Sequence, residues 1–210
     1  MPQGAAMRAA GPRANGPRRR AEEIVEAAAA VFAEKGYHGA STQDVADRLG
    51  MRQASLYYYF RSKEAALEQV CLRDVGMMIE RALEVANGDG GAVEKLSGIV
   101  RNHLLSLGER LAFVRCILRE RRFLPKESRG RINRAMRRYE RIVQAVIESG
   151  IASGALRRDL DARVTTLAVF GLCNAPVDWL GKEPGVTVED IARSFVQLLL
   201  GGIAAGRAGR

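Results

Sequence analysis

The segment that most constrains the fold runs from residue 42 to residue 61 and reads TQDVADRLGMRQASLYYYFR. Its apolar positions have the spacing of two short helices that cross at a steep angle, with the small residue Ala46 and the turn former Gly50 where they meet. Ser41, followed three residues later by Asp44, predicts a capping box at the start of the first helix. The spacing therefore predicts a helix-turn-helix whose second helix can enter the major groove of DNA.

Three adjacent tyrosines close this segment, at positions 57 to 59. Consecutive residues on a helix point in different directions, so at least one tyrosine must face outward, where a phenol can donate to a phosphate oxygen. We expect phosphate contacts from Thr42, Tyr58, Tyr59 and Lys63. The residues expected on the face that meets base edges are Gln43, Arg52, Gln53, Ser55 and Tyr57, with Arg52 the foremost candidate for reading guanine.

These residues resemble the DNA-binding domain of the TetR family of bacterial transcriptional repressors. The resemblance covers about residues 18–67 and rests on Phe32, on the run Leu56-Tyr57-Tyr58-Tyr59-Phe60 and on the pair Lys63-Glu64. It implies an all-α protein of about nine helices, with a three-helix DNA-binding domain at residues 18–64 and a larger effector-binding and dimerisation domain at residues 65–210. The alternative is an unrelated helical hairpin with an aromatic stripe in its core.

Apolar periodicity is helical along the rest of the chain. The expected helices span about 18–36, 63–87, 93–107, 109–121, 125–149, 164–175 and 191–203, in addition to the two of the helix-turn-helix. Pro176 interrupts the pattern after the helix at 164–175. Residues 1–17 are Ala, Gly, Pro and Arg for the most part and contain no acid, so we expect a disordered basic arm.

The remaining composition argues against enzymes and metalloproteins. The two histidines and three cysteines are far apart in the sequence, so we expect no disulfide framework, zinc site or catalytic dyad. The sequence also has no glycine-rich phosphate loop and no apolar run of membrane-spanning length. We therefore expect no cofactor, no metal, no catalytic residue and no membrane contact, in a protein of the reducing cytoplasm.

The last two predicted helices, residues 164–175 and 191–203, are apolar on nearly every side and need cover on two faces. In the TetR family the final two helices pair with their symmetry mates in a four-helix bundle. The resemblance thus implies a homodimer and an operator that is an inverted repeat. The residues expected in the interface are Ala168, Gly171, Ala175, Phe195 and Leu199. Two helices buried inside a monomer are the alternative.

The larger domain is expected to bind a small molecule. The net charge of the chain is +9, and residues 101–141 alone carry +9, with thirteen Lys or Arg and four Asp or Glu. Arginines beside apolar and aromatic positions suit a ligand with an apolar tail and a phosphate-bearing head, the form of acyl-coenzyme A. The expected pocket residues are Met78, Phe113, Cys116, Arg119, Phe123, Arg138, Phe170, Asn174 and Trp179. A solvated basic helix face without a ligand explains the arginines equally well.

A second resemblance is to TetR-type regulators that respond to acyl-CoA esters in the breakdown of fatty acids, aromatic acids or steroids. It rests on GLCN at 171–174 and VEDIA at 188–192. A tryptophan commonly follows the asparagine in that group, whereas this chain has Ala175-Pro176 and places Trp179 further on. The sequence thus predicts a repressor that leaves its operator when an acyl-CoA binds. The alternatives are a multidrug-responsive regulator of efflux, a non-specific architectural DNA-binding protein and an enzyme with an appended helix-turn-helix.

Overall fold

The computed structural model describes residues 17–204, without the side chains of Pro17, Arg18, Glu109, Ala112, Phe113, Cys116 and Ile117. Within this range the chain forms nine α-helices and two short 3-10 helices, η1 and η2, and no strand. The all-α prediction is thereby confirmed. Apart from Pro17, the predicted basic arm at 1–17 lies outside the described residues.

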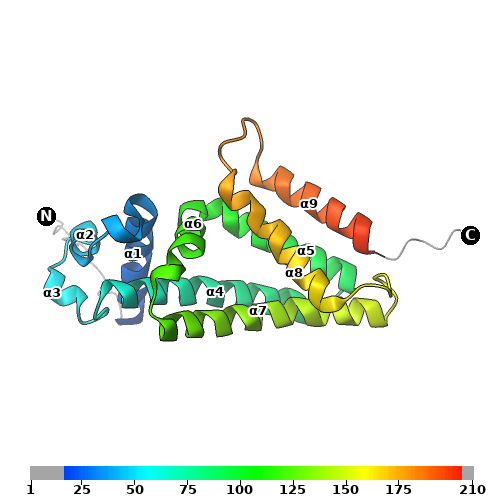
Figure 1. The fold of residues 1–210 in the computed structure, drawn as a ribbon, viewed down its shortest axis with the longest axis horizontal. Coiled ribbons are helices and arrows are strands. Elements are labelled where there is room, and N and C mark those ends of the chain that lie inside the picture. Colours follow the sequence, from blue (N-terminus) through cyan, green and yellow to red (C-terminus); the bar gives the residue numbers. More distant parts are fainter. Residues whose placement is uncertain (1–16, 205–210) are drawn as a thin grey trace, which may run out of the picture.

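The first three helices form a small unit at one end of the molecule (Figure 1). They are α1 (Pro17–Gly39), α2 (Thr42–Arg48) and α3 (Gln53–Leu56). The predicted break at Gly36 is confirmed, because its φ is +68°, a value that favours glycine, and one further turn follows it. Gly50, with a φ of +61°, makes the turn between α2 and α3 in the same way.

Two long helices lie side by side along the longest axis of the molecule (Figure 1). They are α4 (Lys63–Asn87) and α7 (Lys126–Ala152). The start of α4 is fixed because the Ser62 hydroxyl accepts a hydrogen bond from the Ala65 amide, and Pro125 precedes α7. Both bounds of α4 agree with the prediction, whereas α7 continues to Ala152, one turn beyond the predicted end.

The remaining elements complete the larger, C-terminal part of the molecule. They are α5 (Ala92–Glu109), α6 (Leu111–Glu120), η1 (Arg121–Phe123), α8 (Ala162–Asn174), η2 (Ala175–Asp178) and α9 (Val188–Ile203). α8 ends where Pro176 begins to shape η2, as the sequence predicts. α9 begins three residues earlier than predicted, because Thr187 and Asp190 form a capping box.

The molecule has two hydrophobic cores, and α4 contributes side chains to both. Its first half, with Leu67 and Val70, packs in the core of α1 to α3, and its second half, with Val75 and Ile79, packs in the core of the C-terminal helices. Two side chains from the C-terminal part, Leu124 and Ile132, also pack in the first core. A shift of α4 must therefore change the packing of both cores, because close-packed interiors transmit displacement.

Candidate DNA-reading surface and effector cavity

The helix-turn-helix is held together by the apolar residues that the sequence singles out. Val45, Ala46 and Leu56 are buried, and Leu49 and Met51 pack half-buried against them. This contact sets α3 across α2 and leaves the other face of α3 outside the core. The predicted packing of the two helices is confirmed.

The N-terminus of α2 carries the predicted capping box. The Ser41 hydroxyl accepts from the Asp44 amide at 3.1 Å, and the Asp44 carboxylate accepts from the Ser41 amide at 2.8 Å. Hydrogen bonds from the Lys35 ammonium and then from Ser41 lower the pKa of Asp44 to about 2. The carboxylate therefore stays charged at any pH at which the protein works, and α2 stays capped.

The tyrosine row faces largely outward. Tyr58 is 88% exposed and Tyr57 is 47% exposed, whereas Tyr59 is half-buried and packs edge-on against Tyr58 with ring centroids 5.3 Å apart. The prediction that at least one phenol lies outside the core is confirmed. Arg52, which precedes α3 as its N-cap, and Ser55 on α3 are also exposed.

Several of the predicted DNA contacts bind one another across the two helices. The Gln53 side-chain amide donates to the Thr42 hydroxyl at 2.9 Å, and the Tyr57 hydroxyl lies 3.5 Å from the same oxygen. On α2, the Gln43 amide donates to the Asp47 carboxylate at 2.6 Å. These bonds fix the orientation of the polar side chains on one surface in the DNA-free protein.

Lys63 makes contacts within the chain, and its predicted phosphate contact stays a prediction. Its ammonium donates to the carbonyl oxygens of Tyr37 and Ala40, at 2.8 and 3.0 Å, and lies 4.5 Å from the centre of the Tyr37 ring. Two of its three hydrogens are therefore used to hold the end of α1 against the start of α4. The sequence could not show this, because both carbonyl groups lie more than twenty residues away.

Phe123, the last residue of η1, lies against the end of α1. Its ring stacks on Tyr37, with centroids 5.8 Å apart and planes 4° apart, and meets the His38 ring edge-on at 4.3 Å. The Tyr37 hydroxyl in turn donates to Glu64 at 2.6 Å. Phe123 thus joins η1 to the end of α1, and its predicted pocket role stays a prediction.

A buried polar cluster of His103 and Tyr139 lies in the C-terminal core, and the predicted pocket residues Phe170 and Asn174 contact it. His103 Nδ1 lies 3.2 Å from the Tyr139 hydroxyl, and Phe170 meets both rings edge-on. Burial lowers the pKa of His103 to about 4, and the Asn174 amide opposes only part of that shift. Burial also raises the pKa of Tyr139. Both side chains are therefore neutral at physiological pH.

One cavity adjoins this cluster, and a second cavity adjoins the first. The inner one, of about 10 Å³, lies between α4, α5 and α7 and is lined by Met78, His103 and Tyr139, among others. The outer one, of about 190 Å³, lies between α1, α4 and α5 and is lined by Asp74 and three arginines: Arg73, Arg81 and Arg110. Sequence reasoning missed His103, although its position three residues after Val100 and four before Leu107 placed it on a buried face.

The other predicted pocket residues are dispersed. Arg119 forms an exposed ion pair with Asp178 at 2.7 Å, and Arg138 lines a surface groove of about 670 Å³ between α4 and α7, together with Lys95 and Arg141. Trp179 is half-buried beside the second core. The side chains of Phe113 and Cys116 lie outside the described residues. The predicted arginine rim is thus not gathered at one opening.

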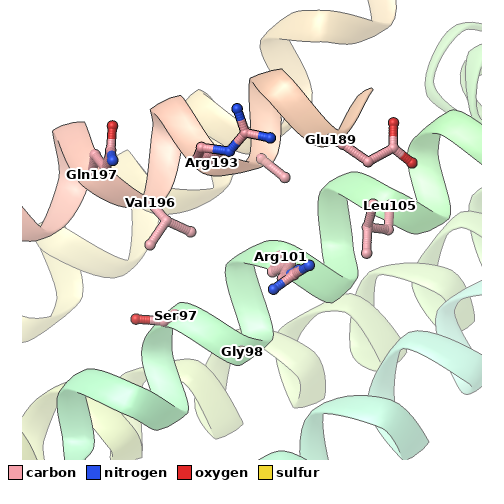
Figure 2. Close-up of a pocket in the computed structure, with 9 residues that line it drawn as sticks. Ser97, Gly98, Arg101, Leu105, Glu189, Arg193, Val196 and Gln197 are labelled. Atoms are coloured by element: carbon pink, nitrogen blue, oxygen red, sulfur yellow. The ribbon is translucent and has the colours of Figure 1, made fainter. Parts of the chain in front are cut away.

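A further groove, of about 450 Å³, runs between α5 and α9. Figure 2 shows Arg101 on α5 and Arg193 on α9 beside it, with Leu105 and Val196 among the apolar lining residues. Arg193 donates to Asp190 at 3.2 Å. None of the polar side chains that line this groove is buried, so its surface is open to solvent.

An apolar stripe is exposed along α8. Val164 is 63% exposed and Leu167 is 48% exposed. The predicted interface residues Ala168 and Gly171 on α8, and Ala175 at the start of η2, are also exposed. On α9, Leu198 is 67% exposed, whereas Phe195 and Leu199 are half-buried. An uncovered stripe of this kind is typical of a surface that binds a partner.

Two kinds of site are absent from residues 17–204. No group of three or more His, Cys, Asp or Glu side chains is placed to hold a metal ion. No described helix combines the length and the apolar character needed to cross a bilayer.

Comparison with known proteins identifies both parts of the chain. A family model described as bacterial regulatory proteins, tetR family, matches residues 24–70, and one described as tetracyclin repressor-like, C-terminal domain, matches residues 89–203. The chain is 30% identical to the fatty acid metabolism regulator protein of Bacillus subtilis (strain 168) over 184 residues, which cover 86% of this chain and 94% of that protein.

Solved structures agree with this result. The crystal structure of FadR from Bacillus subtilis in complex with stearoyl-CoA has a TM-score of 0.77 at 28% identity, covering 86% of this chain and 98% of that one. The crystal structure of AibR in complex with isovaleryl coenzyme A and operator DNA has a TM-score of 0.76 at 25% identity, covering 85% and 97%.

The buried histidine makes the stability of the protein depend on pH. Because its folded pKa, about 4, lies below the ordinary value of about 6.5, only the unfolded chain takes up this proton between these values, and stability falls as pH falls. Asp74, whose pKa burial raises to about 6, acts in the opposite direction over about pH 4 to 6. The two effects partly offset each other in the wild type.

We therefore predict that His103→Asn gains stability relative to the wild type on acidification. Moving from pH 7 to pH 5 should shift the difference in unfolding free energy between the two proteins by on the order of 2 kcal/mol in favour of the variant. Urea denaturation of both proteins at both pH values measures this shift. An identical pH dependence in the two proteins would contradict the burial of a neutral His103.

Proposed function

This chain belongs to the TetR family of bacterial transcriptional regulators, and on that premise we propose that it is a ligand-released repressor that binds an inverted-repeat operator as a homodimer. The observation that carries the proposal is similarity over more than four-fifths of the chain to regulators whose structures hold CoA esters. An acyl-CoA is therefore the proposed effector.

The exposed face of the helix-turn-helix is the proposed operator contact. Arg52 is exposed and can donate two parallel hydrogen bonds to guanine, whereas Tyr58 projects from the end of α3 and can donate to a phosphate oxygen. Thr42, Gln53 and Tyr57 are already joined by hydrogen bonds, so their orientation requires little ordering on binding. Gln43, Ser55 and Tyr59 complete the proposed surface.

We predict that Arg52→Ala and Tyr58→Phe weaken operator binding in different ways. Arg52→Ala should cost on the order of 1 to 3 kcal/mol and lose discrimination at one base pair, because its guanidinium reads a base edge. Tyr58→Phe should weaken binding to all duplexes to a similar extent, because a phosphate carries no sequence information. Fluorescence anisotropy with an operator selected from random DNA, and with its single-base variants, measures both effects.

Arg193→Ala is the matched control, because it removes the same charge from α9, far along the chain from the helix-turn-helix. A uniform loss of affinity on Arg52→Ala, equal at every base variant, would overturn the assignment of Arg52 to a base. A wild-type protein that bound scrambled and selected duplexes alike would favour the architectural alternative.

The exposed stripe of α8 is the proposed dimer interface, with Phe195 and Leu199 of α9 at its edge. Val164 and Leu167 leave apolar surface in water that a second copy would cover, and the small residues Ala168, Gly171 and Ala175 allow two helices to approach closely. Two-fold symmetry of this kind presents one reading helix to each half of an inverted repeat.

We predict that Gly171→Glu converts the dimer to a monomer and weakens operator binding at least tenfold. A Cβ at Gly171 meets no atom within 4 Å in the monomer, so the variant should fold, while its charge would be buried in the dimer seam. Gly130→Glu on α7 is the control, since a Cβ there meets only Arg134 at 3.5 Å. Light scattering gives the mass, and a monomeric wild-type protein would contradict the proposal.

We predict that an acyl-CoA releases the operator, whereas the matching free acid and free CoA do not. The test adds short-, medium- and long-chain acyl-CoAs, aromatic-acid CoA esters, free acids and hydrophobic cations to the protein–operator complex and follows anisotropy. Release by hydrophobic cations but by no CoA ester would transfer the proposal to a multidrug-responsive regulator of efflux.

A further inference from the structure

The inner and outer cavities are separated by one thin wall of side chains. Met78 and Arg81 of α4 and Ser106 of α5 line both cavities. The Arg81 guanidinium donates a short hydrogen bond to the Ser106 hydroxyl and so joins the two helices across the wall. Met78 has an unbranched side chain that can adopt another rotamer at little cost. Moving these three side chains would join the two cavities.

The outer cavity has the chemistry of an anion site at the rim. Arg73, Arg81 and Arg110 contribute three positive charges, against the carboxylates of Glu26 and Asp74. Arg73 pairs with Glu26 at 3.0 Å, and Arg110 pairs with Asp74 at 3.2 Å. Burial raises the pKa of Asp74 to about 6, so this carboxylate takes up a proton more readily than an exposed one would when an anion enters beside it.

The inner cavity is lined by His103, whose Nε2 makes no hydrogen bond of regular geometry. His103 is 6% exposed, and among the described residues its Nε2 is the buried side-chain polar atom without a hydrogen bond of regular geometry. The Asn174 side chain, which raises the pKa of the ring against the effect of burial, makes only a weaker contact with it. Leaving such an atom unpaired is costly in a folded protein. The ring is neutral, and the protonated Tyr139 hydroxyl can donate to Nδ1, which places the ring proton on Nε2. Nε2 is then a donor on a side chain that lines the inner cavity.

We propose that the two cavities form one effector channel, and that His103 Nε2 donates a hydrogen bond to the carbonyl oxygen of the thioester. The inference rests on the proposed acyl-CoA effector and adds where its thioester group binds. The phosphate-bearing part would lie at the rim arginines, and the acyl chain would displace Met78 beside Phe170 and Tyr139. Binding would also separate α4 from α5, and α4 continues into the core of the DNA-reading unit.

The direct test compares each acyl-CoA with its thioether. Butyryl-, octanoyl- and hexadecanoyl-CoA are titrated into the wild-type protein beside S-butyl-, S-octyl- and S-hexadecyl-CoA, which have the same number of carbons and no carbonyl oxygen. The ester that binds best should bind about tenfold more tightly than its thioether, the factor expected for one neutral hydrogen bond in a buried site. Equal binding of ester and thioether overturns the role of His103.

Two variants separate the two ring nitrogens. His103→Asn keeps an amide near the place of Nδ1, beside Tyr139, but has no atom at Nε2, so the preference for ester over thioether should fall to about onefold. His103→Gln places an amide nitrogen near Nε2 and should keep most of the preference. A preference that survives His103→Asn overturns the proposal. The comparison on the wild type stands alone if either variant fails to fold.

The route is tested by Ser106→Ala, which removes the hydrogen bond across the wall. Stopped-flow association of the ester should become several-fold faster, and an unchanged rate overturns the proposed path between the cavities.

The effector class and the role of His103 are tested by different outcomes. If no CoA ester binds the wild type, the effector class and the channel are both overturned. If an ester binds but its thioether binds equally, the effector class stands and His103 serves only a buried water.

Discussion

The structure depends on the continuity of α4 through two hydrophobic cores. One uninterrupted helix of 25 residues supplies Leu67 and Val70 to the core of the DNA-reading unit and Val75 and Ile79 to the core of the C-terminal helices. Both cores are close-packed, so neither can absorb a displacement of α4 without rearranging. A ligand that alters the packing of α4 against α5 therefore has a mechanical connection to the orientation of the helix-turn-helix.

A second connection runs through the aromatic joint at the end of α1. Tyr37 is covered by the Phe123 ring from η1 and bound through its hydroxyl by Glu64 of α4. The Lys63 ammonium lies over the same ring and closes the turn after α1. The end of α1 is thus held from two sides, by α4 and by the segment after α6. Any relative movement of these two elements must be accommodated at Tyr37.

Burial of His103 has a cost that a core made only of apolar residues would avoid. A leucine of similar volume would pack without an unpaired nitrogen, and the pH-dependent stability that follows from a neutral buried imidazole would be absent. The proposed channel gives this cost a function, since the same atom that weakens the ligand-free core would be satisfied by a bound carbonyl group. The affinity for the effector and the ability to tell an ester from its thioether would then both come from this one hydrogen bond.

Features that depend on near neighbours in the chain can be predicted from residue spacing alone. The helix-turn-helix, the Ser41–Asp44 capping box, the break at Gly36 and the bounds of α4 follow from spacing within a few residues. The partners of Lys63 and Phe123 depend instead on how distant helices pack. The same holds for the pairing of His103 with Tyr139, which lie 36 residues apart. Periodicity shows that a side chain is buried, but the atoms it meets depend on how distant helices cross, and that is set by the packing of the whole core.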